Sequence, residues 1–558
     1  MTGPAALRAG PVTAGGVIRS EWIKLRSVRS TAAVLALSVV IMAVFPLLLG
    51  TRPSYNPVDQ SLFGVHFATL AVSVLGVLVI TGEYASGTIL ATFCAVPRRL
   101  RVLWAKAAVL GAVVFAVTLA GALLAVAAGQ ARYGGASLAS AGAVRAVLGT
   151  ALFLTVMGLL GLGFGCWTRS AAGGITAVIA FTYIFSQGGD VLPASWQPHV
   201  IPYLPFQAGE AVYTVQPHPA YAGELLGPWA GLGVLCGYLA VTLAAAAVTV
   251  RRTDATSPFG WKQRARRLLP RVRRPAGYSE TRAVGPALAT SSLTALRPVA
   301  VCPVTLAAVF RSEWIKVRSV RSPGIVAAFT VALIVAVGLI ATTSTDWSAM
   351  TAAQRASFDP IGQSLLGVRN FADVPAGILG VLVITGDYTT GMIRAVFCAV
   401  PGRLPVLWAK AAVLALTLFT VTLIASPVAF LGGQALLGSH GTSLGAPDAL
   451  RAVTGASLFL TVAGLLGIGL GFLTRSTAGG IAAFVGLQDV LSELRLALPA
   501  SWQPHVSPYL PGDAGKAVFA TPPYGADTLH PWAGFAVYCG YAAAVIAAAA
   551  IALRKRDA

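Results

Sequence analysis

Long runs of apolar residues alternate with short polar segments along the whole chain. Twelve of these runs have the length, about 20 residues, of a helix that crosses the hydrocarbon core of a bilayer. Because lipid offers no hydrogen-bond partners, each run must satisfy its own backbone as a helix. The pattern predicts an all-α polytopic membrane protein with about 12 transmembrane helices. We expect them near residues 31–50, 62–82, 105–130, 146–167, 172–190, 228–250, 323–344, 362–385, 409–436, 452–473, 478–497 and 531–553.

The chain contains an internal repeat. The segment Ser20–Ser30 (SEWIKLRSVRS) returns as Ser312–Ser322 (SEWIKVRSVRS), and Pro193–His199 (PASWQPH) returns unchanged as Pro499–His505. Six spans in each copy put both ends of that copy on one side of the membrane, so we expect parallel rather than inverted repeats. The predicted units are a first six-span unit over residues 1–251, a linker over 252–307 and a second six-span unit over 308–558.

Composition and charge narrow the class of protein. Hydrophobic residues make up 56% of the 558 residues and charged residues only 11%. Soluble domains carry about 25% charged residues, so a soluble multidomain enzyme is excluded. The net charge is +21, and 32 of the 40 lysines and arginines fall on one side if both termini are cytoplasmic. This bias follows the positive-inside rule and predicts a multi-pass protein of the cytoplasmic (inner) membrane without a nucleic-acid partner.

Basic residues also gather in the linker. Lys262–Arg267 and Arg271–Arg274 lie there among Pro, Gly and Ser residues. We interpret them as a solvated basic segment beside anionic lipid, with docking of a specific partner as the alternative.

An amphipathic segment precedes the first span of each unit. Ile18, Trp22 and Leu25 recur at helical spacing on one face, and Lys and Arg occupy the other. This pattern predicts an interfacial helix that lies on the cytoplasmic membrane surface against lipid, while an ordinary positively charged flank is the alternative. The residues expected at that surface are Trp22, Lys24 and Arg26 in the first unit and Trp314, Lys316 and Arg318 in the second.

The loop after the second span of each unit combines turn, charge and apolar signals. It reads Gly82–Thr88 (GEYASGT), then a short apolar stretch, then Pro97. Its copy reads Gly386–Met392 (GDYTTGM), an apolar stretch and Pro401. The bounding glycine and proline predict a short cytoplasmic helix whose apolar side is available to another protein, with basic residues around it at the headgroups.

In order and spacing, these features resemble the ABC-2 type export permeases. In that family each unit has six spans, and the loop between its second and third spans holds a coupling helix that docks into an ATPase subunit. The resemblance covers nearly the whole chain twice, so it implies two ATPase copies and fused halves that replace a permease homodimer. The second copy departs from the family pattern, with Asp387 in place of Glu and Met392 in place of Thr. These differences leave open whether the second loop engages an ATPase. The resemblance assigns to the coupling loops Glu83, Gly87, Thr88, Pro97, Asp387, Gly391 and Pro401.

The resemblance implies the membrane subunit of an ATP-driven exporter, of the kind that gives antibiotic resistance by efflux. Its substrate is expected to be hydrophobic or amphipathic, such as a drug, a peptide antibiotic or a lipid. The sequence contains no GxxxxGK[ST] motif, so we expect ATP on the partner subunit and no cofactor or catalytic residue in this chain. His199 and His505 lack the spacing of metal ligands, and by resemblance the segments around them form short re-entrant helices at the outer mouth.

Charged residues inside the predicted spans are concentrated in the second unit. Arg369 and Asp373 lie four residues apart in its second span, and Asp489 and Glu493 lie in its fifth. Charges at this depth usually face a cavity or a partner, so one hypothesis places these four residues along the substrate path. The other hypothesis is a structural ion pair between Arg369 and Asp373 on one helix face.

An ion-coupled secondary transporter or channel that acts without an ATPase is the alternative function. Parallel repeats weigh against it, as does the lack of any run of Asp, Glu or His that resembles a proton relay. A membrane-embedded enzyme is a third interpretation, and no convergent catalytic groups in the sequence support it.

Overall fold

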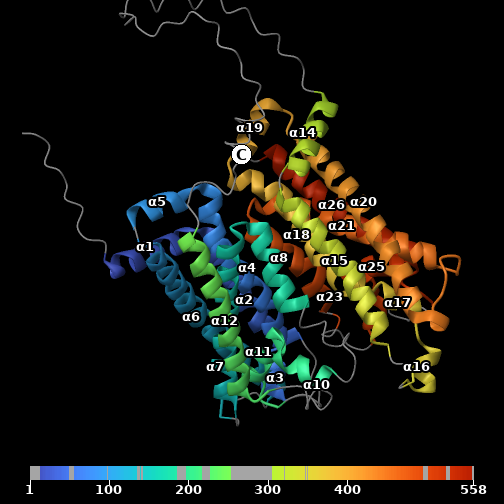
Figure 1. Cartoon of the computed structure of the whole chain (residues 1–558), viewed down its shortest axis with the longest axis horizontal. Helices are drawn as coiled ribbons and strands as arrows, with labels where there is room; N and C mark the ends of the chain where they lie inside the picture. Colours follow the sequence, from blue (N-terminus) through green and yellow to red (C-terminus); the bar gives the residue numbers. More distant parts are fainter. Residues whose placement is uncertain are drawn as a thin grey trace, which may run out of the picture.

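A computed structural model gives the fold of the chain (Figure 1). Within the described residues, all regular structure is helical. The structure describes residues 13–48, 56–96, 98–134, 138–139, 142–184, 196–216, 226–252, 305–319, 321–345, 347–348, 350–493, 495, 501–522 and 528–555. Pro97 and most of the linker lie outside these described residues, so the predictions made for them are not tested.

Ten helices in the described part of the chain are long and apolar enough to cross a membrane. They indicate a multi-pass membrane protein, as the apolar pattern predicts. Five belong to each half and follow one another in the same order. They are α2 (Arg29–Leu48), α4 (Val65–Ser86), α6 (Arg99–Tyr133), α7 (Ala143–Thr168) and α12 (Pro228–Arg252), then α15 (Arg321–Thr343), α18 (Asp373–Thr389), α20 (Leu404–Leu437), α21 (Ala449–Thr474) and α26 (Pro531–Lys555).

The fifth apolar segment of each half forms shorter helices. In both halves an α-helix of nine residues continues as a π-helix, and part of the remaining predicted span lies outside the described residues. Ten of the twelve predicted spans are thus present as long helices, and a membrane-spanning fifth segment in each half stays a prediction. The elements are α8 (Ala171–Ile179) and η1 (Ala180–Ile184), then α22 (Thr477–Val485), η8 (Gly486–Val490) and α23 (Leu491–Glu493).

Short helices gather at the two ends of the long ones. Figure 1 shows α5, α14 and α19 at one end, which we call the α5/α19 end, and α3, α10 and α16 at the other, the α3/α16 end. Helices α1 (Ala14–Ser27) and α14 (Leu306–Ser319) are the two amphipathic segments, so the predicted helices are present. Helices α5 (Thr88–Ala95) and α19 (Met392–Ala399) follow the second span of each half, as predicted.

The remaining short elements connect the spans. Those after the fifth segment of each half include the short helices expected around His199 and His505. In the first half the short connecting elements are α3 (Pro57–Ser61), α10 (Gln197–Val200), η3 (Ile201–Tyr203) and α11 (Pro205–Tyr213). In the second they are α16 (Ala352–Ala356), α17 (Pro360–Ser364), η6 (Val368–Ala372), η7 (Gly438–His440), α24 (Gln503–Val506), η10 (Ser507–Tyr509), α25 (Pro511–Lys516) and η11 (Ala517–Phe519).

Glycines allow the second and fourth spans of each half to approach closely. A Cβ atom on Gly76 of α4 would lie 1.9 Å from the carbonyl oxygen of Gly158 of α7. One on Gly161 would lie 2.1 Å from the carbonyl oxygen of Ser73. Close backbone contact of this kind stabilises helix pairs in lipid, where apolar burial drives little association. The second half repeats it with α18 and α21, through Gly380 on Gly464 and Gly467 on Gly377.

The two halves pack against each other through their fifth segments. Helix α8 of the first half contacts α15 of the second, and α22 of the second half contacts α2 of the first. Ile175 and Val178 of α8 are fully buried in the same apolar cluster as Val326 and Ile334 of α15. The halves thus form one packed bundle, and relative movement between them must shift these contacts.

Candidate functional site

Four oppositely charged side chains meet where α1, α4 and α6 of the first half join. The Lys106 ammonium donates to a carboxylate oxygen of Glu21 and to one of Glu83, the latter 2.9 Å away. Lys24 donates to the same two acids, 2.8 Å to Glu21 and 3.1 Å to Glu83. These four residues, the first charge cluster, therefore link one short helix to two spans.

The second half contains the same arrangement between α14, α18 and α20. The Lys410 ammonium lies 2.6 Å from oxygens of both Glu313 and Asp387. Lys316 lies 2.6 Å from Glu313 and 3.6 Å from Asp387. These residues form the second charge cluster. Its longest contact involves the acid that is one methylene shorter than Glu83 in the first half.

The charge clusters are largely withdrawn from solvent. The side chains of Lys106 and Glu21 are each 3% exposed, Glu83 is 12% exposed and Lys24 is 36% exposed. Such burial is tolerated because two ammonium groups balance two carboxylates, whereas removing one member leaves a buried charge unpaired. Burial lowers the pKa of Lys24, but its hydrogen bond to Glu21 and the nearby Glu83 charge outweigh that effect and raise the pKa.

Sequence reasoning identified part of each charge cluster and missed the rest. Glu83 and Asp387 were predicted as loop residues, and Lys24 and Lys316 as surface residues of the amphipathic helices. The remaining members are two acids inside those helices, Glu21 and Glu313, and two lysines near the start of the third span, Lys106 and Lys410. The lysines belong to the repeated tripeptide Trp-Ala-Lys and to the sequence pattern that follows the second span, but the sequence does not predict them as site residues. The two acids were missed.

A left-handed glycine separates each second span from the short helix that follows. Gly87 has φ +74° and directly precedes α5, and Gly391 has φ +71° and precedes α19. Residues with a Cβ atom rarely adopt this conformation, which explains glycine at both positions. The chain can therefore turn sharply out of the span and place α5 and α19 across its end.

The other predicted loop residues surround this turn. Thr88 is the first residue of α5, and its hydroxyl lies 2.9 Å from the Ser86 hydroxyl. Pro401 lies in an exposed turn after α19. Lys24 also donates to the Thr92 hydroxyl of α5 at 3.2 Å, which attaches that helix directly to the first charge cluster. Pro97 is outside the described residues.

The amphipathic helices use a different face for packing than the sequence predicts. Val17, Glu21 and Leu25 are the buried residues of α1, whereas Ile18 is 44% and Trp22 46% exposed. The predicted stripe of Ile18, Trp22 and Leu25 is thus divided between the protein and its surroundings. The missed acid Glu21 lies on the packed face because it meets Lys106 there. Of the remaining predicted surface residues, Arg26 and Arg318 are exposed and Trp314 and Lys316 are half-buried.

Two of the charges predicted inside the second-half spans, Asp373 and Asp489, lie near the buried Tyr538. Asp373 is 2% exposed, and its carboxylate accepts from the Gln488 amide at 3.4 Å. The Gln488 oxygen in turn accepts from the fully buried Tyr538 hydroxyl at 3.1 Å. Arg369 is exposed and forms no ion pair with Asp373 within the described part of the chain. Asp489 is half-buried, and the Glu493 side chain is outside the description.

A π-helix separates Arg369 from Asp373. Arg369 lies in η6, which runs from Val368 to Ala372 and ends just before Asp373. A π-helix bonds residue i to i+5 and has a wider turn than an α-helix. Arg369 is exposed whereas Asp373 is buried, and the structural ion pair proposed from the i, i+4 spacing is not formed in the described part of the chain.

The first half has no equivalent of the buried chain from Asp373 through Gln488 to Tyr538. When the repeated helices are aligned, the corresponding residues are Thr69, Thr182 and Leu235. Both threonine hydroxyls donate to carbonyl oxygens of their own helices instead. The polar link between the second, fifth and sixth segments thus belongs to the second half.

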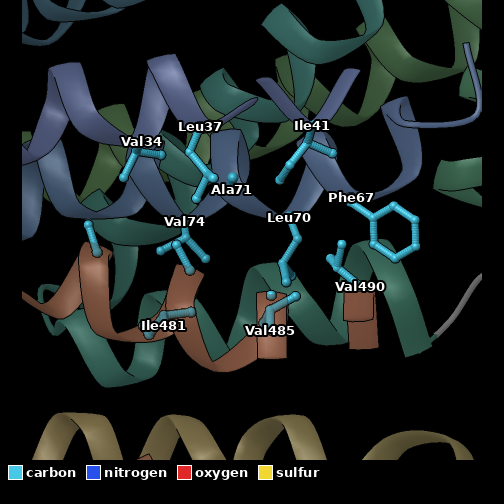
Figure 2. A pocket seen from close by; sticks show the side chains of 13 residues that line it. Val34, Leu37, Ile41, Phe67, Leu70, Ala71, Val74, Ile481, Val485 and Val490 are labelled. Atoms are coloured by element: carbon cyan, nitrogen blue, oxygen red, sulfur yellow. The ribbon is translucent and has the colours of Figure 1, made fainter. Parts of the chain in front are cut away.

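An apolar crevice lies between the halves. Figure 2 shows Val34, Leu37 and Ile41 of α2 on one side and Ile481 and Val485 of α22 on the other. The crevice encloses about 20 Å³, which is room for about one water molecule. It is a narrow gap at the interface of the halves and, in this conformation, no chamber for a substrate.

Polar clamps hold the backbone at the α3/α16 end. Asp59 accepts from the amides of Val215 and Gln216 at 2.6 and 2.9 Å. Arg145 donates to the carbonyl oxygen of Thr214 at 2.8 Å. Burial is the main cause that raises the pKa of Asp59 to about 6, and burial raises the pKa of Glu210 to about 7. The second half repeats the clamp with Arg451 on the carbonyl oxygens of Val518 and Ala520 and with Asp359 accepting from Thr521.

Comparisons with known proteins do not place the chain in a family. No family model matches the sequence, and no curated protein matches it. Among the described residues, no three His, Cys, Asp or Glu side chains come together in a group that could hold a metal ion. The charge clusters themselves contain ion pairs that connect three helices in each half.

Proposed function

We propose that this chain is the membrane subunit of an ATP-driven exporter, powered by a separate ATPase. The observation that supports it best is that each charge cluster joins the end of the second span, just before a coupling-type helix, to an amphipathic helix and a third span. Movement of α5 would be passed to α1 and α6 through Glu21, Glu83 and Lys106, which share hydrogen bonds.

In this proposal the chain consists of two parallel six-span units with the α5/α19 end in the cytoplasm of an inner-membrane protein. Two ATPase subunits bind α5 and α19, and ATP holds those subunits together. Their closure pulls on both short helices and tilts one half against the other. The contacts of α8 with α15 and of α22 with α2 would have to slide, and the apolar crevice would widen.

The proposed substrate is hydrophobic or amphipathic, such as a drug, a peptide antibiotic or a lipid. The crevice supports this class because its lining is apolar on both sides. Arg369, Asp373, Asp489 and Glu493 remain candidates for the substrate path. Of the three whose side chains the structure describes, Arg369 is the exposed one and could meet a substrate directly, whereas the buried Asp373 could act only by holding Gln488.

Co-purification tests the proposal. The chain is extracted gently from its native membrane, and the preparation is assayed for ATP hydrolysis and for a subunit with Walker motifs. The test variant carries Gly87→Leu and Gly391→Leu, and the control carries Gly82→Leu, at an exposed helical site where a Cβ meets no atom within 4 Å. We expect the ATPase with the wild type and the control and its loss in the double variant.

Absence of any ATPase would contradict the proposal. Chemical crosslinking before extraction guards against loss of a weakly bound subunit. If no ATPase is captured even then, the ion-coupled transporter or channel becomes the better interpretation, and transport driven by ion gradients in liposomes is the assay that follows.

A further inference from the structure

We infer that α5 and α19 dock on chemically different surfaces, and that the surface facing α19 supplies a carboxylate to Arg394. This inference rests on the proposed function, which makes both helices docking sites for an ATPase. It adds the chemistry of the partner surface, and it requires that the two ATPase subunits differ where they meet α5 and α19.

The inner faces of the two helices are similar. In α5, Ile89 is 3% exposed and packs against the body of the protein, with the half-buried Phe93 one turn later. In α19, Ile393 is 3% and Phe397 8% exposed at the same positions. Each helix is therefore fixed by one apolar face, and its opposite face is turned away from the chain.

The outer faces are alike except at two positions. All five positions are exposed in both helices, and three carry the same residue. The one change in charge puts Arg394 in place of Leu90, which is 42% exposed. The aligned pairs are Thr88 and Met392, Leu90 and Arg394, Ala91 and Ala395, Cys94 and Cys398, and Ala95 and Ala399.

Arg394 serves no visible purpose inside the chain. It is exposed, and within the described residues it takes no part in an ion pair. The second charge cluster is complete without it, with two lysines and two acids. An arginine on an otherwise uncharged face is a suitable donor for a carboxylate on a partner, because guanidinium groups bind carboxylates in a fixed geometry.

The cations near the first helix lie elsewhere. Arg98 and Arg101 are exposed just after α5, and their aligned residues are Gly402 and Pro405. Positive charge is thus at the edge of the first contact and at the centre of the second. A partner surface that suits α5 needs an apolar centre, whereas the surface for α19 needs an acid there.

A protein surface fits this pattern better than a lipid surface. Anionic headgroups would attract Arg394 but would gain nothing from Leu90, which occupies the same place on α5. The short side chains of Ala91 and Ala95 in α5, and of the aligned alanines 395 and 399 in α19, allow the backbone of a partner to approach both outer faces closely. We therefore assign the carboxylate to the ATPase and treat lipid as an outcome of the test.

Two native cysteines provide matched reporters of docking. Cys94 and Cys398 are exposed at the same position of α5 and α19. Two chains are made in which all other cysteines are replaced by Ala, leaving Cys94 or Cys398 alone. Their rates of reaction with N-ethylmaleimide are compared in native membranes and, after purification, in vesicles of phosphatidylcholine and phosphatidylglycerol.

We expect both thiols to react more slowly in native membranes than in vesicles. Arg394→Leu, which makes the outer face of α19 resemble that of α5, should remove the protection of Cys398 and leave that of Cys94. Because a charged hydrogen bond is lost, docking of α19 should weaken about tenfold or more. Arg394→Lys should retain part of the protection, and Leu90→Arg should weaken protection of Cys94 only. Loss of the nearby cation alone would slow the reaction of the Cys398 thiol with N-ethylmaleimide. A faster reaction in Arg394→Leu therefore shows that the partner no longer covers α19.

Each other outcome has a distinct meaning. If both thiols are protected and Arg394→Leu changes nothing, the carboxylate inference is wrong while the proposed function stands. If neither thiol is protected in native membranes, the docking of α5 and α19 fails, and the proposed function fails with it. Equal rates in native membranes and in vesicles, both slower than in detergent solution, would mean that lipid covers the helices, which also overturns the inference.

Discussion

The Lys410 ammonium lies 2.6 Å from an oxygen of Asp387, an acid at the far end of the preceding span. The same ammonium lies 2.6 Å from Glu313 on the amphipathic helix α14. Lys106 occupies the same place between Glu83 and Glu21 in the first half. Each charge cluster thus connects three helices, so replacement of any of its residues should lower the stability of the protein.

Lys106→Met should destabilise the protein strongly. It leaves the Glu21 and Glu83 carboxylates with Lys24 as their only cation in the cluster, and breaking a buried pair costs about 3–5 kcal/mol. Thermal unfolding of the detergent-solubilised protein measures the effect. Arg101→Met, at an exposed position of the same helix, is the control and should leave the midpoint nearly unchanged. Adding Glu21→Gln to Lys106→Met should recover part of the loss, because one pair then remains.

The sequence predicts the helices well because apolar length and period are local properties. The charge clusters need more, since Glu21 meets Lys106 only when α1 folds back onto α6, and no local signal specifies that contact. Asp373 shows a second limit. Its spacing from Arg369 predicts an ion pair, but the acid instead meets Gln488 from a distant segment, and no local signal specifies that contact.

Gly87→Ala should loosen α5 without unfolding the bundle. A Cβ at Gly87 meets no atom within 4 Å, so the penalty comes from φ +74° alone, about 1–2 kcal/mol. Faster hydrogen exchange of the amides of residues 88–95 would report it. Gly87→Asn should have a smaller effect because asparagine tolerates this conformation. Equal exchange in Gly87→Ala and in the helical control Gly82→Ala would refute the role assigned to this glycine.

Tyr538→Phe should destabilise the second half. The Gln488 oxygen would lose the hydroxyl that donates to it at 3.1 Å, and a buried unsatisfied acceptor costs about 1–3 kcal/mol. Tyr541→Phe is a matched control, since the Tyr541 hydroxyl donates to the Tyr509 carbonyl at an exposed site. Thermal unfolding compares the two variants. A larger loss in Tyr541→Phe would show that the buried polar chain adds no stability.

Replacing Asp373 or Arg369 distinguishes an effect on stability from an effect on substrate selection. Asp373→Ala should lower the unfolding midpoint, because the buried Gln488 amide loses its acceptor. Arg369→Ala changes an exposed residue and should spare the midpoint while altering transport of a cationic or anionic dye relative to a neutral one. If Asp373→Ala, Asp489→Ala and Arg369→Ala proteins all transport normally, the charged residues do not belong to the substrate path.

Stability should depend on pH through Glu210 and Asp59 at the α3/α16 end. Burial raises the pKa of Glu210 to about 7 and that of Asp59 to about 6, so the folded state binds their protons more readily than the unfolded chain does. Under proton linkage, the free energy of unfolding then rises as pH falls from about 8 to 5 and decreases as pH rises through these values. The unfolding midpoint should follow the same trend.

Glu210→Gln isolates this effect. Glutamine mimics the protonated acid at every pH, so the variant should unfold at a higher temperature than the wild type at pH 8 and show a flatter profile down to pH 5. Lys516→Gln, at the aligned position of the second half, removes no carboxylate and should keep the wild-type slope in that range. An unchanged slope in Glu210→Gln would mean that this carboxyl is solvated and ionised throughout. The α3/α16 end would then lack the acid-stabilised clamp that its burial predicts.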